Sequence, residues 1–120
     1  MLLRLLTALA LMGSAGATSL ERITAYNAVH GQGSGNPLQG ACKGPRGDYR
    51  LPRDAVAVSR DLLGAYPCGT RVRVRAGGRV YVGVVADVTH RRFWRTVDIR
   101  MASRSGALRF GVKTGSITRL

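Results

Sequence analysis

Residues 71–86 read RVRVRAGGRVYVGVVA and decide the fold. Arginine and valine alternate strictly from Arg71 to Arg75, which predicts a strand with one buried face and one charged face. Ala76-Gly77-Gly78 is a hairpin signal. The return strand, Arg79 to Ala86, is almost entirely apolar, so we expect it to be central. The stretch therefore predicts an antiparallel β-hairpin.

Further short elements flank this hairpin on both sides. Strands are predicted over 23–27, 55–59, 96–99 and 112–120, with a helical turn at 60–64. A short helix is predicted over 103–110, with Ser103 as its N-cap and Gly111 after its end. Residues 31–47 are rich in glycine and proline and predict a long exposed loop. Six short strands favour a small β-barrel, which leaves no open sheet edge.

Length and composition limit the remaining choices. The chain has 120 residues, enough for one small domain, and 45% are hydrophobic, which excludes a disordered polyelectrolyte. No GxxxxGK[ST], HExxH or CxxC motif occurs. We therefore expect neither a metal ion nor an organic cofactor.

The first seventeen residues, MLLRLLTALALMGSAGA, have the form of a signal peptide. Arg4 precedes a short apolar run, and Ala15-Gly16-Ala17 resembles a small-x-small cleavage site. The alternative is an ordinary N-terminal helix of a cytosolic domain. We expect residues 1–17 to be removed, leaving 18–120 as one domain. The expected location is outside the cytoplasm, in the periplasm or cell envelope, with no transmembrane segment after removal of the signal.

The two cysteines, Cys42 and Cys68, suit an exported chain. We predict a disulfide between them. One alternative is a pair of buried free thiols. Another is a Cys₂His₂ metal site with His30 and His90, which the spacing disfavours because no two of the four are closely paired.

The charge is strongly positive, with 19 Lys and Arg against 6 Asp and Glu. In a cytosolic chain this would suggest nucleic acid. Export shifts the expected partner to anionic cell-wall polysaccharide, with no nucleic acid expected. The arginine excess also fits a compositional bias of the coding sequence, and one sequence does not separate the two.

Two aspartates are the best candidates for chemistry. Asp87 ends an apolar strand and Asp98 lies within one, where burial would raise the carboxyl pKa toward the range that a general acid needs. The alternative is that each caps a turn or pairs with an arginine. His90 and Trp94 lie in the loop between them, where Trp94 could stack on a sugar ring or cover the core. Arg92, in the same loop, is solvent-facing or binds substrate.

The order of these pieces resembles the double-psi β-barrel domains of cell-wall proteins. The closest resemblances are to rare lipoprotein A-like domains and to the three-aspartate (3D) domain, which also occurs in membrane-bound lytic transglycosylase A; expansins and family 45 endoglucanases lie further off. The pieces that carry the resemblance are 56–59, 67–70, 72–74, 85–87, 97–99, Ala107 and 110–111. Thr24-Ala25-Tyr26 is similar to the opening strand of the three-aspartate group.

The resemblance implies that Asp98 is the acid/base of a lytic transglycosylase and that Asp87 is the second aspartate of the groove. In those enzymes one carboxyl protonates the glycosidic oxygen of peptidoglycan and then deprotonates the muramic acid 6-hydroxyl, leaving an anhydro end. The substrate-binding set predicted with them is Ser59, Tyr26, His90, Trp94 and Arg92.

Ser59 departs from the enzyme pattern, because it stands where those groups have Asp or His. Expansin-type barrels, which bind wall polymers without cleaving them, commonly have Ser at this position. We therefore carry two hypotheses for a monomeric, secreted protein. The first is a transglycosylase-like enzyme that uses Asp98, and the second is a non-catalytic, expansin-like module that binds or loosens the wall.

Overall fold

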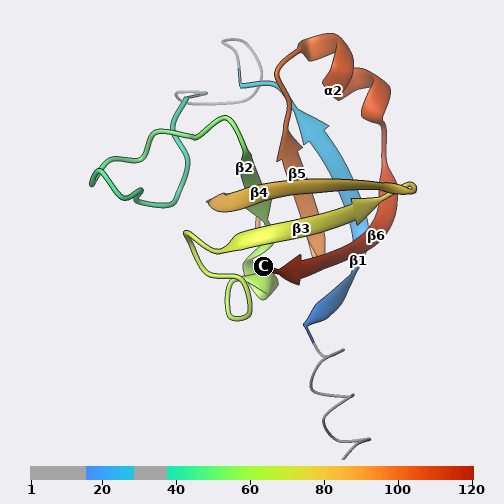
Figure 1. Cartoon of the computed structure of the whole chain (residues 1–120), viewed down its shortest axis with the longest axis horizontal. Helices are drawn as coiled ribbons and strands as arrows, with labels where there is room; N and C mark the ends of the chain where they lie inside the picture. Colours follow the sequence, from blue (N-terminus) through green and yellow to red (C-terminus); the bar gives the residue numbers. More distant parts are fainter. Residues whose placement is uncertain (1–15, 29–37) are drawn as a thin grey trace, which may run out of the picture.

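The computed structural model describes residues 16–28 and 38–120. Six strands close into a barrel in the order β1-β5-β2-β4-β3-β6, which confirms the predicted small six-stranded barrel (Figure 1). The elements in chain order are β1 (Ala17–Tyr26), β2 (Ala55–Val58), the 3₁₀ turn η1 (Arg60–Leu62), β3 (Arg71–Ala76), β4 (Arg79–Val88), β5 (Thr96–Arg100), helix α2 (Arg104–Phe110) and β6 (Lys113–Arg119).

Parallel and antiparallel pairs alternate around part of the barrel. β1 pairs in parallel with β5, and β2 pairs in parallel with β4, while β2 and β5 are antiparallel. β3 joins β4 and β6 by antiparallel pairing, and β6 returns to β1. Strands distant in sequence therefore lie side by side, as the double-psi expectation requires.

The local signals behave as the sequence predicts. Gly77 and Gly78 both have positive φ, 56° and 80°, which is the two-residue hairpin geometry that glycine favours. The Ser103 hydroxyl accepts a hydrogen bond from the Gly106 N–H at 3.0 Å and caps α2. Gly111 ends that helix with φ 69°.

The barrel interior is filled mainly by β-branched side chains. Arg71 to Ala76 place their valines inward and their arginines outward, as predicted. The largest fully buried side chains are Ile23, Ile117, Val58, Val72, Val74, Val85 and Val97. Tyr81 packs edge-on against Phe110, with ring centroids 5.6 Å apart, and so covers one end of this core.

The return strand β4 lies between β2 and β3, as expected for a central strand, but one face of its first half is open to solvent. Val80 and Val82 are 48% and 49% exposed. Alternate residues of a barrel strand face outward, so the interior takes only Tyr81, Gly83 and Val85 from this stretch. An apolar run in the sequence does not show that both of its faces are covered.

The segment 38–52 crosses the end of β4 and is tied to the barrel. Cys42 and Cys68 form the predicted disulfide, so neither thiol is free and the metal alternative is wrong. The Cys42 N–H donates to the Ala86 carbonyl at 3.3 Å. Gly40 lies against the same strand so closely that a Cβ there would collide with the Ala86 oxygen.

Several predictions concern residues that the structure does not describe. Residues 1–15, most of the expected signal peptide, and His30 lie outside the described residues. The expected cleavage point after Ala17 falls at the first residue of β1 and stays a prediction. Within 16–28 and 38–120, no helix is long and apolar enough to cross a membrane.

Candidate functional site

A row of four residues crosses neighbouring strands at one end of the barrel. Thr24 of β1 pairs with Asp98 of β5, Asp98 pairs with Ala57 of β2, and Ala57 pairs with Asp87 of β4. The small side chain of Ala57 therefore separates the two carboxylates. The sheet itself brings Thr24, Asp98 and Asp87 together, although they come from three distant parts of the chain.

An irregularity in the pairing of β2 with β4 completes this row. Val56 pairs with Val85 but the next residue, Ala57, pairs with Asp87, so Ala86 is passed over. Such bulges re-aim side chains and recur beside active sites. Without the shift, Ala86 would stand opposite Ala57, and Asp87 would lie one position further along β4.

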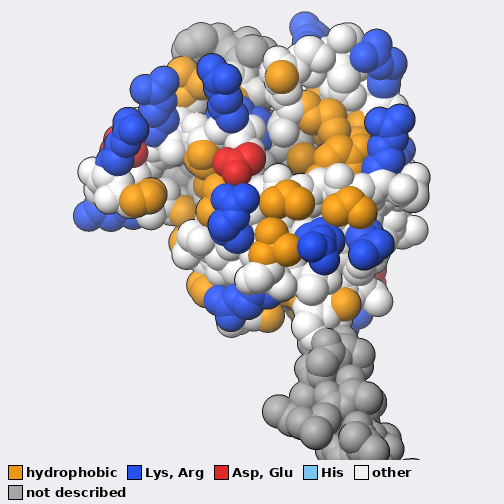
Figure 2. Space-filling view, viewed as in Figure 1, with side chains coloured by type: hydrophobic (Ala, Val, Ile, Leu, Met, Phe, Trp, Pro, Cys, Tyr) orange, Lys and Arg blue, Asp and Glu red, His pale blue; other side chains and the backbone are white. Residues whose placement is uncertain are grey.

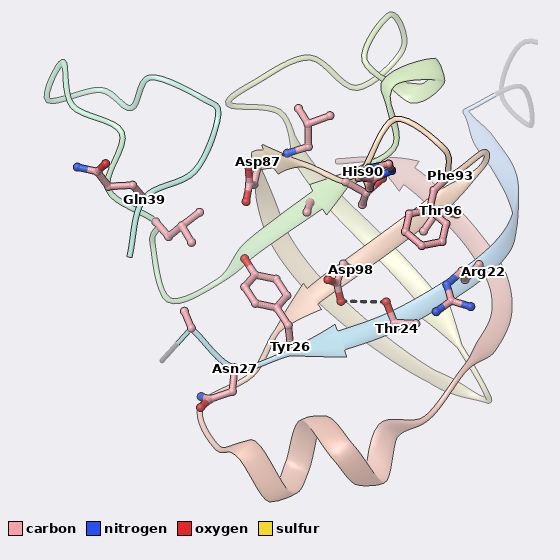
Figure 3. Close-up of a pocket in the computed structure, with 15 residues that line it drawn as sticks. Arg22, Thr24, Tyr26, Asn27, Gln39, Asp87, His90, Phe93, Thr96 and Asp98 are labelled. Atoms are coloured by element: carbon pink, nitrogen blue, oxygen red, sulfur yellow. Dashed lines mark hydrogen bonds between the residues drawn. The ribbon is translucent and has the colours of Figure 1, made fainter. Parts of the chain in front are cut away.

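A cavity of about 410 Å³ opens over this row. Its size lies within the range of about 300–1,000 Å³ that is usual for small-ligand sites. Figure 3 shows side chains from β1, β4, β5, the segment at Gln39 and the loop at 89–95 converging on it. The lining residues with polar or aromatic side chains are Arg22, Thr24, Tyr26, Asn27, Gln39, Asp87, Thr89, His90, Phe93, Thr96 and Asp98.

Asp98 is the carboxylate whose acidity this environment changes most. Burial raises its pKa to about 6, and the negative charge of Asp87 acts in the same direction. The Thr24 hydroxyl donates to Asp98 Oδ1 at 2.9 Å, and this bond, together with the charge of Arg22, holds the pKa back (Figure 3). Asp98 can thus exchange a proton near neutral pH.

Asp87 is held by backbone groups. Its Oδ1 accepts hydrogen bonds from the N–H groups of Ala41 at 2.8 Å and Val88 at 2.9 Å. The first bond fastens the segment 38–52 beside the cavity. Asp87 therefore positions a wall of the site as well as contributing charge to it.

Two hydroxyl groups in the cavity have no partner in the described parts of the chain. The oxygens of Tyr26 and Thr89 are buried and accept or donate no hydrogen bond there. Burial raises the pKa of the Tyr26 phenol above its ordinary value, and the charges of Asp87 and Asp98 add to this effect while Arg100 opposes it. The phenol stays protonated and can donate a hydrogen bond to a ligand oxygen.

The loop 89–95 forms the opposite wall, with Phe93 at its centre. The guanidinium groups of Arg22 and Arg92 lie 5.1 Å and 4.8 Å from the Phe93 ring centroid. The His90 ring meets Phe93 edge-on at 6.5 Å. These contacts orient the aromatic ring at the edge of the cavity.

Asp61, from the 3₁₀ turn η1, anchors the end of this loop. Its carboxylate accepts the Arg95 N–H at 3.1 Å, and Arg95 has φ 43°, an uncommon value for a residue with a side chain. The Arg95 carbonyl accepts the Glu21 N–H at 2.9 Å, which joins the loop to β1. The carboxylate lies 34 positions from its partner in sequence, so no local pattern predicts the contact.

The structure brings together four of the predicted site residues in the cavity wall: Asp98, Asp87, Tyr26 and His90. Arg92 does not line the cavity, but its guanidinium lies over Phe93 and its N–H donates to His90 Nδ1 at 3.2 Å. Trp94 is 58% exposed and does not line the cavity. Ser59 is fully buried and does not line the cavity. Its hydroxyl accepts a hydrogen bond from the Thr96 N–H at 2.9 Å and so stabilises the start of β5.

Sequence reasoning assigned no role to Thr24, Arg22 and Phe93. Thr24 and Tyr26 are two positions apart, so they share one face of β1. This spacing could have shown that Thr24 lies beside Tyr26 in the site. Phe93 lies within the loop already singled out for its aromatic and basic residues. No local signal marks Arg22.

The described residues contain no cluster of three or more His, Cys, Asp or Glu side chains that could hold a metal ion. The polar groups of the cavity are two carboxylates, hydroxyls, amides, a guanidinium and the His90 imidazole. Such a set suits a ligand with many hydroxyl groups.

Comparison with known proteins supports the fold. No family profile and no curated protein matches the sequence. Among solved structures, the chain is similar to an apo expansin of Clavibacter michiganensis, with 25% identity and a TM-score of 0.58 over 87% of this chain and 50% of that one. A point variant of the same expansin in complex with cellohexaose matches with 23% identity, a TM-score of 0.58 and the same coverage. The chain thus spans about half the length of these expansins.

Proposed function

We propose that this chain is an extracellular module that binds or loosens cell-wall polysaccharide, with the cavity over Asp98 as its glycan site. The likeness to an expansin, one form of which holds cellohexaose, supports a neutral or weakly charged glycan as ligand. The disulfide is consistent with an oxidising compartment outside the cytoplasm.

The observation that carries this proposal is the pair of buried hydroxyls on Tyr26 and Thr89, which find no partner among residues 16–28 and 38–120. A buried polar group without a partner costs about 1–3 kcal/mol. Sugar hydroxyls both donate and accept, so a glycan in the cavity can satisfy both groups at once. The Asp98 carboxylate and the Thr24 hydroxyl oxygen, which are bonded to each other, supply further acceptors on the same wall.

Asp98 favours a second candidate function, in which the site cleaves the glycan it binds. A carboxyl with a pKa of about 6 is protonated often enough to donate to a glycosidic oxygen near neutral pH. As the bond between the anomeric carbon and the protonated glycosidic oxygen breaks, the carboxylate so formed could accept the proton of the muramic acid 6-hydroxyl. The 6-oxygen would then bond to the anomeric carbon in place of water and leave a 1,6-anhydro end. In this reaction Asp87 tunes the charge of the groove.

The test combines sedimentation with insoluble wall polymers and product analysis. Wild-type protein is mixed with cellulose and, separately, with peptidoglycan, and the bound fraction and soluble products are measured. Tyr26→Phe removes only the unpaired hydroxyl, and Phe93→Ala removes the aromatic edge. Trp94→Ala is the matched aromatic control outside the cavity.

We expect Tyr26→Phe and Phe93→Ala to weaken binding about tenfold or less, as for loss of one or two ligand contacts, with Trp94→Ala unchanged. Binding without products supports the module. Anhydro-muropeptides that disappear in Asp98→Asn support the enzyme. Equal binding by all the variants would contradict the assigned site.

A further inference from the structure

The outer face of β3 and β4 carries a second ordered pattern of side chains. Arg71, Arg73 and Arg75 of β3 stand in register with Val84, Val82 and Val80 of β4. We call these six residues the arginine–valine strip. Figure 2 shows basic and hydrophobic side chains interspersed over this face, and basic side chains along the loop beside it.

The charges of the strip are largely unpaired. Within the described residues, neither Arg73 nor Arg75 has a carboxylate within 4.0 Å; the ion pair found there joins Arg71 to Asp54 at 3.7 Å, with both side chains solvent-exposed. An exposed ion pair of this kind contributes roughly 0–1 kcal/mol, so Arg71 can still bind another anion. Val80 and Val82, about half exposed, lie beside these cations.

A second cavity, of about 490 Å³, lies at the end of the strip nearest the disulfide. Val84 belongs to both, which makes the two surfaces continuous. Its wall from the segment 38–52 adds three cations and one carboxylate, from Lys43, Arg46, Arg50 and Asp48. The segment thus separates this basic surface from the cavity over Asp98, whose lining includes Gln39 and Leu51 of the same segment.

The spacing of the strip suits a linear ligand. Alternate residues of a strand are about 6.6–6.8 Å apart, so the guanidinium stems repeat at that interval along β3. Guanidinium groups bind carboxylates through paired hydrogen bonds. The valines offer a flat apolar surface against which the C–H faces of sugar rings can pack.

Nucleic acid fits this face less well. Binding of single strands relies on aromatic side chains on which bases stack. The aromatic residue of β4, Tyr81, is turned away from the strip and packs on Phe110. The strip offers charge and aliphatic surface but no stacking platform.

We propose that the arginine–valine strip, with the adjoining basic cavity, binds a linear polysaccharide that bears carboxylates, a uronate polymer. This site is separate from the cavity over Asp98 and goes beyond the proposed function. A single chain would then hold a charged wall polymer on one face and a second glycan in the groove.

The test measures the affinity of a fluorescent oligogalacturonate by anisotropy, at low and high salt. Its methyl ester, which lacks the charge, and a single-stranded DNA of similar length are the comparison probes. Arg73→Gln combined with Arg75→Gln tests the strip. Arg104→Gln combined with Arg109→Gln makes the same charge change on exposed positions of α2, and Tyr26→Phe probes the groove.

We expect the strip variant to bind the oligogalacturonate about tenfold more weakly and the α2 variant to change affinity less than about twofold. Tyr26→Phe should leave this affinity unchanged, so failure here is distinguishable from failure of the groove. High salt should weaken binding because exposed charges are screened. Equal losses in both arginine variants, equal binding of the ester, or equal or tighter binding of the DNA would each overturn the proposal.

Discussion

The two sides of the segment 38–52 use opposite chemistry. On one side, two carboxylates, and two hydroxyls that have no partner within the described residues, lie in a cavity over the row that crosses β1, β5, β2 and β4. On the other, arginines and valines cover the outer face of the sheet. The groove gains its properties from burial, which alters the acidity of Asp98, whereas the strip stays in water and acts by charge. Net charge alone, strongly positive here, describes only the second region.

One strand serves both regions. Up to Ala86, alternate residues of β4 face outward and contribute the valines of the strip. At the pairing shift between Val56 and Ala57 of the neighbouring strand, Asp87 comes into line with Ala57 and Asp98. The bulge therefore marks the boundary between the two regions. Before it, the alternation of side chains along β4 forms the strip, and beyond it, the register of neighbouring strands forms the groove.

The largest predicted effect removes the clamp shared by the two regions. Cys42→Ser combined with Cys68→Ser opens a loop of sequence separation 26. The chain-entropy relation predicts a loss of about 3.5 kcal/mol in the free energy of unfolding. Urea unfolding of variant and wild type measures it.

A matched control is the wild type under reducing conditions, which should show the same loss. We also expect both the groove and the basic cavity to bind more weakly, because the segment 38–52 walls both. Unchanged stability in the double variant would contradict the role given to the disulfide.

The next effect isolates the groove. The folded pKa of Asp98, about 6, lies above its ordinary 3.8, so the folded state favours the protonated carboxyl. Stability contributed by this group is present below the ordinary value and is lost as the pH rises through about 6. Asp98→Asn should therefore raise the free energy of unfolding by up to about 3 kcal/mol at pH near 8 and change it little at pH near 3.5.

Unfolding curves at the two pH values measure this difference. Asp48→Asn, which removes an exposed carboxylate of the segment 38–52, is the matched charge control. A stability gain equal at both pH values would mean that burial does not set the acidity of Asp98.

A smaller effect concerns the wall of the groove. Asp87→Ala leaves the N–H groups of Ala41 and Val88 without their carboxylate acceptor. We expect a loss of about 1 kcal/mol, since the Ala41 amide is exposed and water can replace part of the bond. Asp87→Asn keeps an oxygen at this position and should lose less, as measured by thermal or urea unfolding.

The same pair of aspartates gives a direct electrostatic test. The charge of Asp87 raises the pKa of Asp98, so Asp87→Asn should lower that pKa from about 6. Carboxyl carbon shifts followed through a pH titration by NMR report it. An unchanged or higher pKa would show that the two carboxylates do not sense one another.

The smallest effect is expected at Trp94. Its side chain is 58% exposed and lies outside both cavities. Trp94→Ala should change the free energy of unfolding by less than about 0.5 kcal/mol. A larger loss in thermal unfolding would show that this ring covers the core after all.

The barrel was accessible from the sequence because its signals are local. Alternation in 71–75, the paired glycines at 77–78 and the cap at Ser103 each act over a few residues, and all three are confirmed. The disulfide followed from cysteine count. The exposure of Val80 and Val82 could not be predicted from the sequence, because an apolar run looks the same whether one or both of its faces are covered.

The site was only partly accessible because strand register is not local. Asp87 and Asp98 were found through their apolar neighbours. Their place in one row depends on the pairing of Asp98 with Thr24 across distant strands and on a bulge that aligns Asp87, and the sequence marks neither. The burial of Ser59 and the Asp61 bond to Arg95 likewise depend on residues more than thirty positions away.

The central claim, that the groove over Asp98 is the glycan site, is tested most directly by an NMR titration. Cellohexaose is added to ¹⁵N-labelled protein, and the amide shifts are followed residue by residue. The proposal predicts saturable shifts centred on Thr24, Tyr26, Thr89 and Asp98, which line the groove, with β3 unaffected. Saturable shifts confined to β3 and β4 at the arginine–valine strip, or no saturable shifts with either this probe or peptidoglycan fragments, would contradict it.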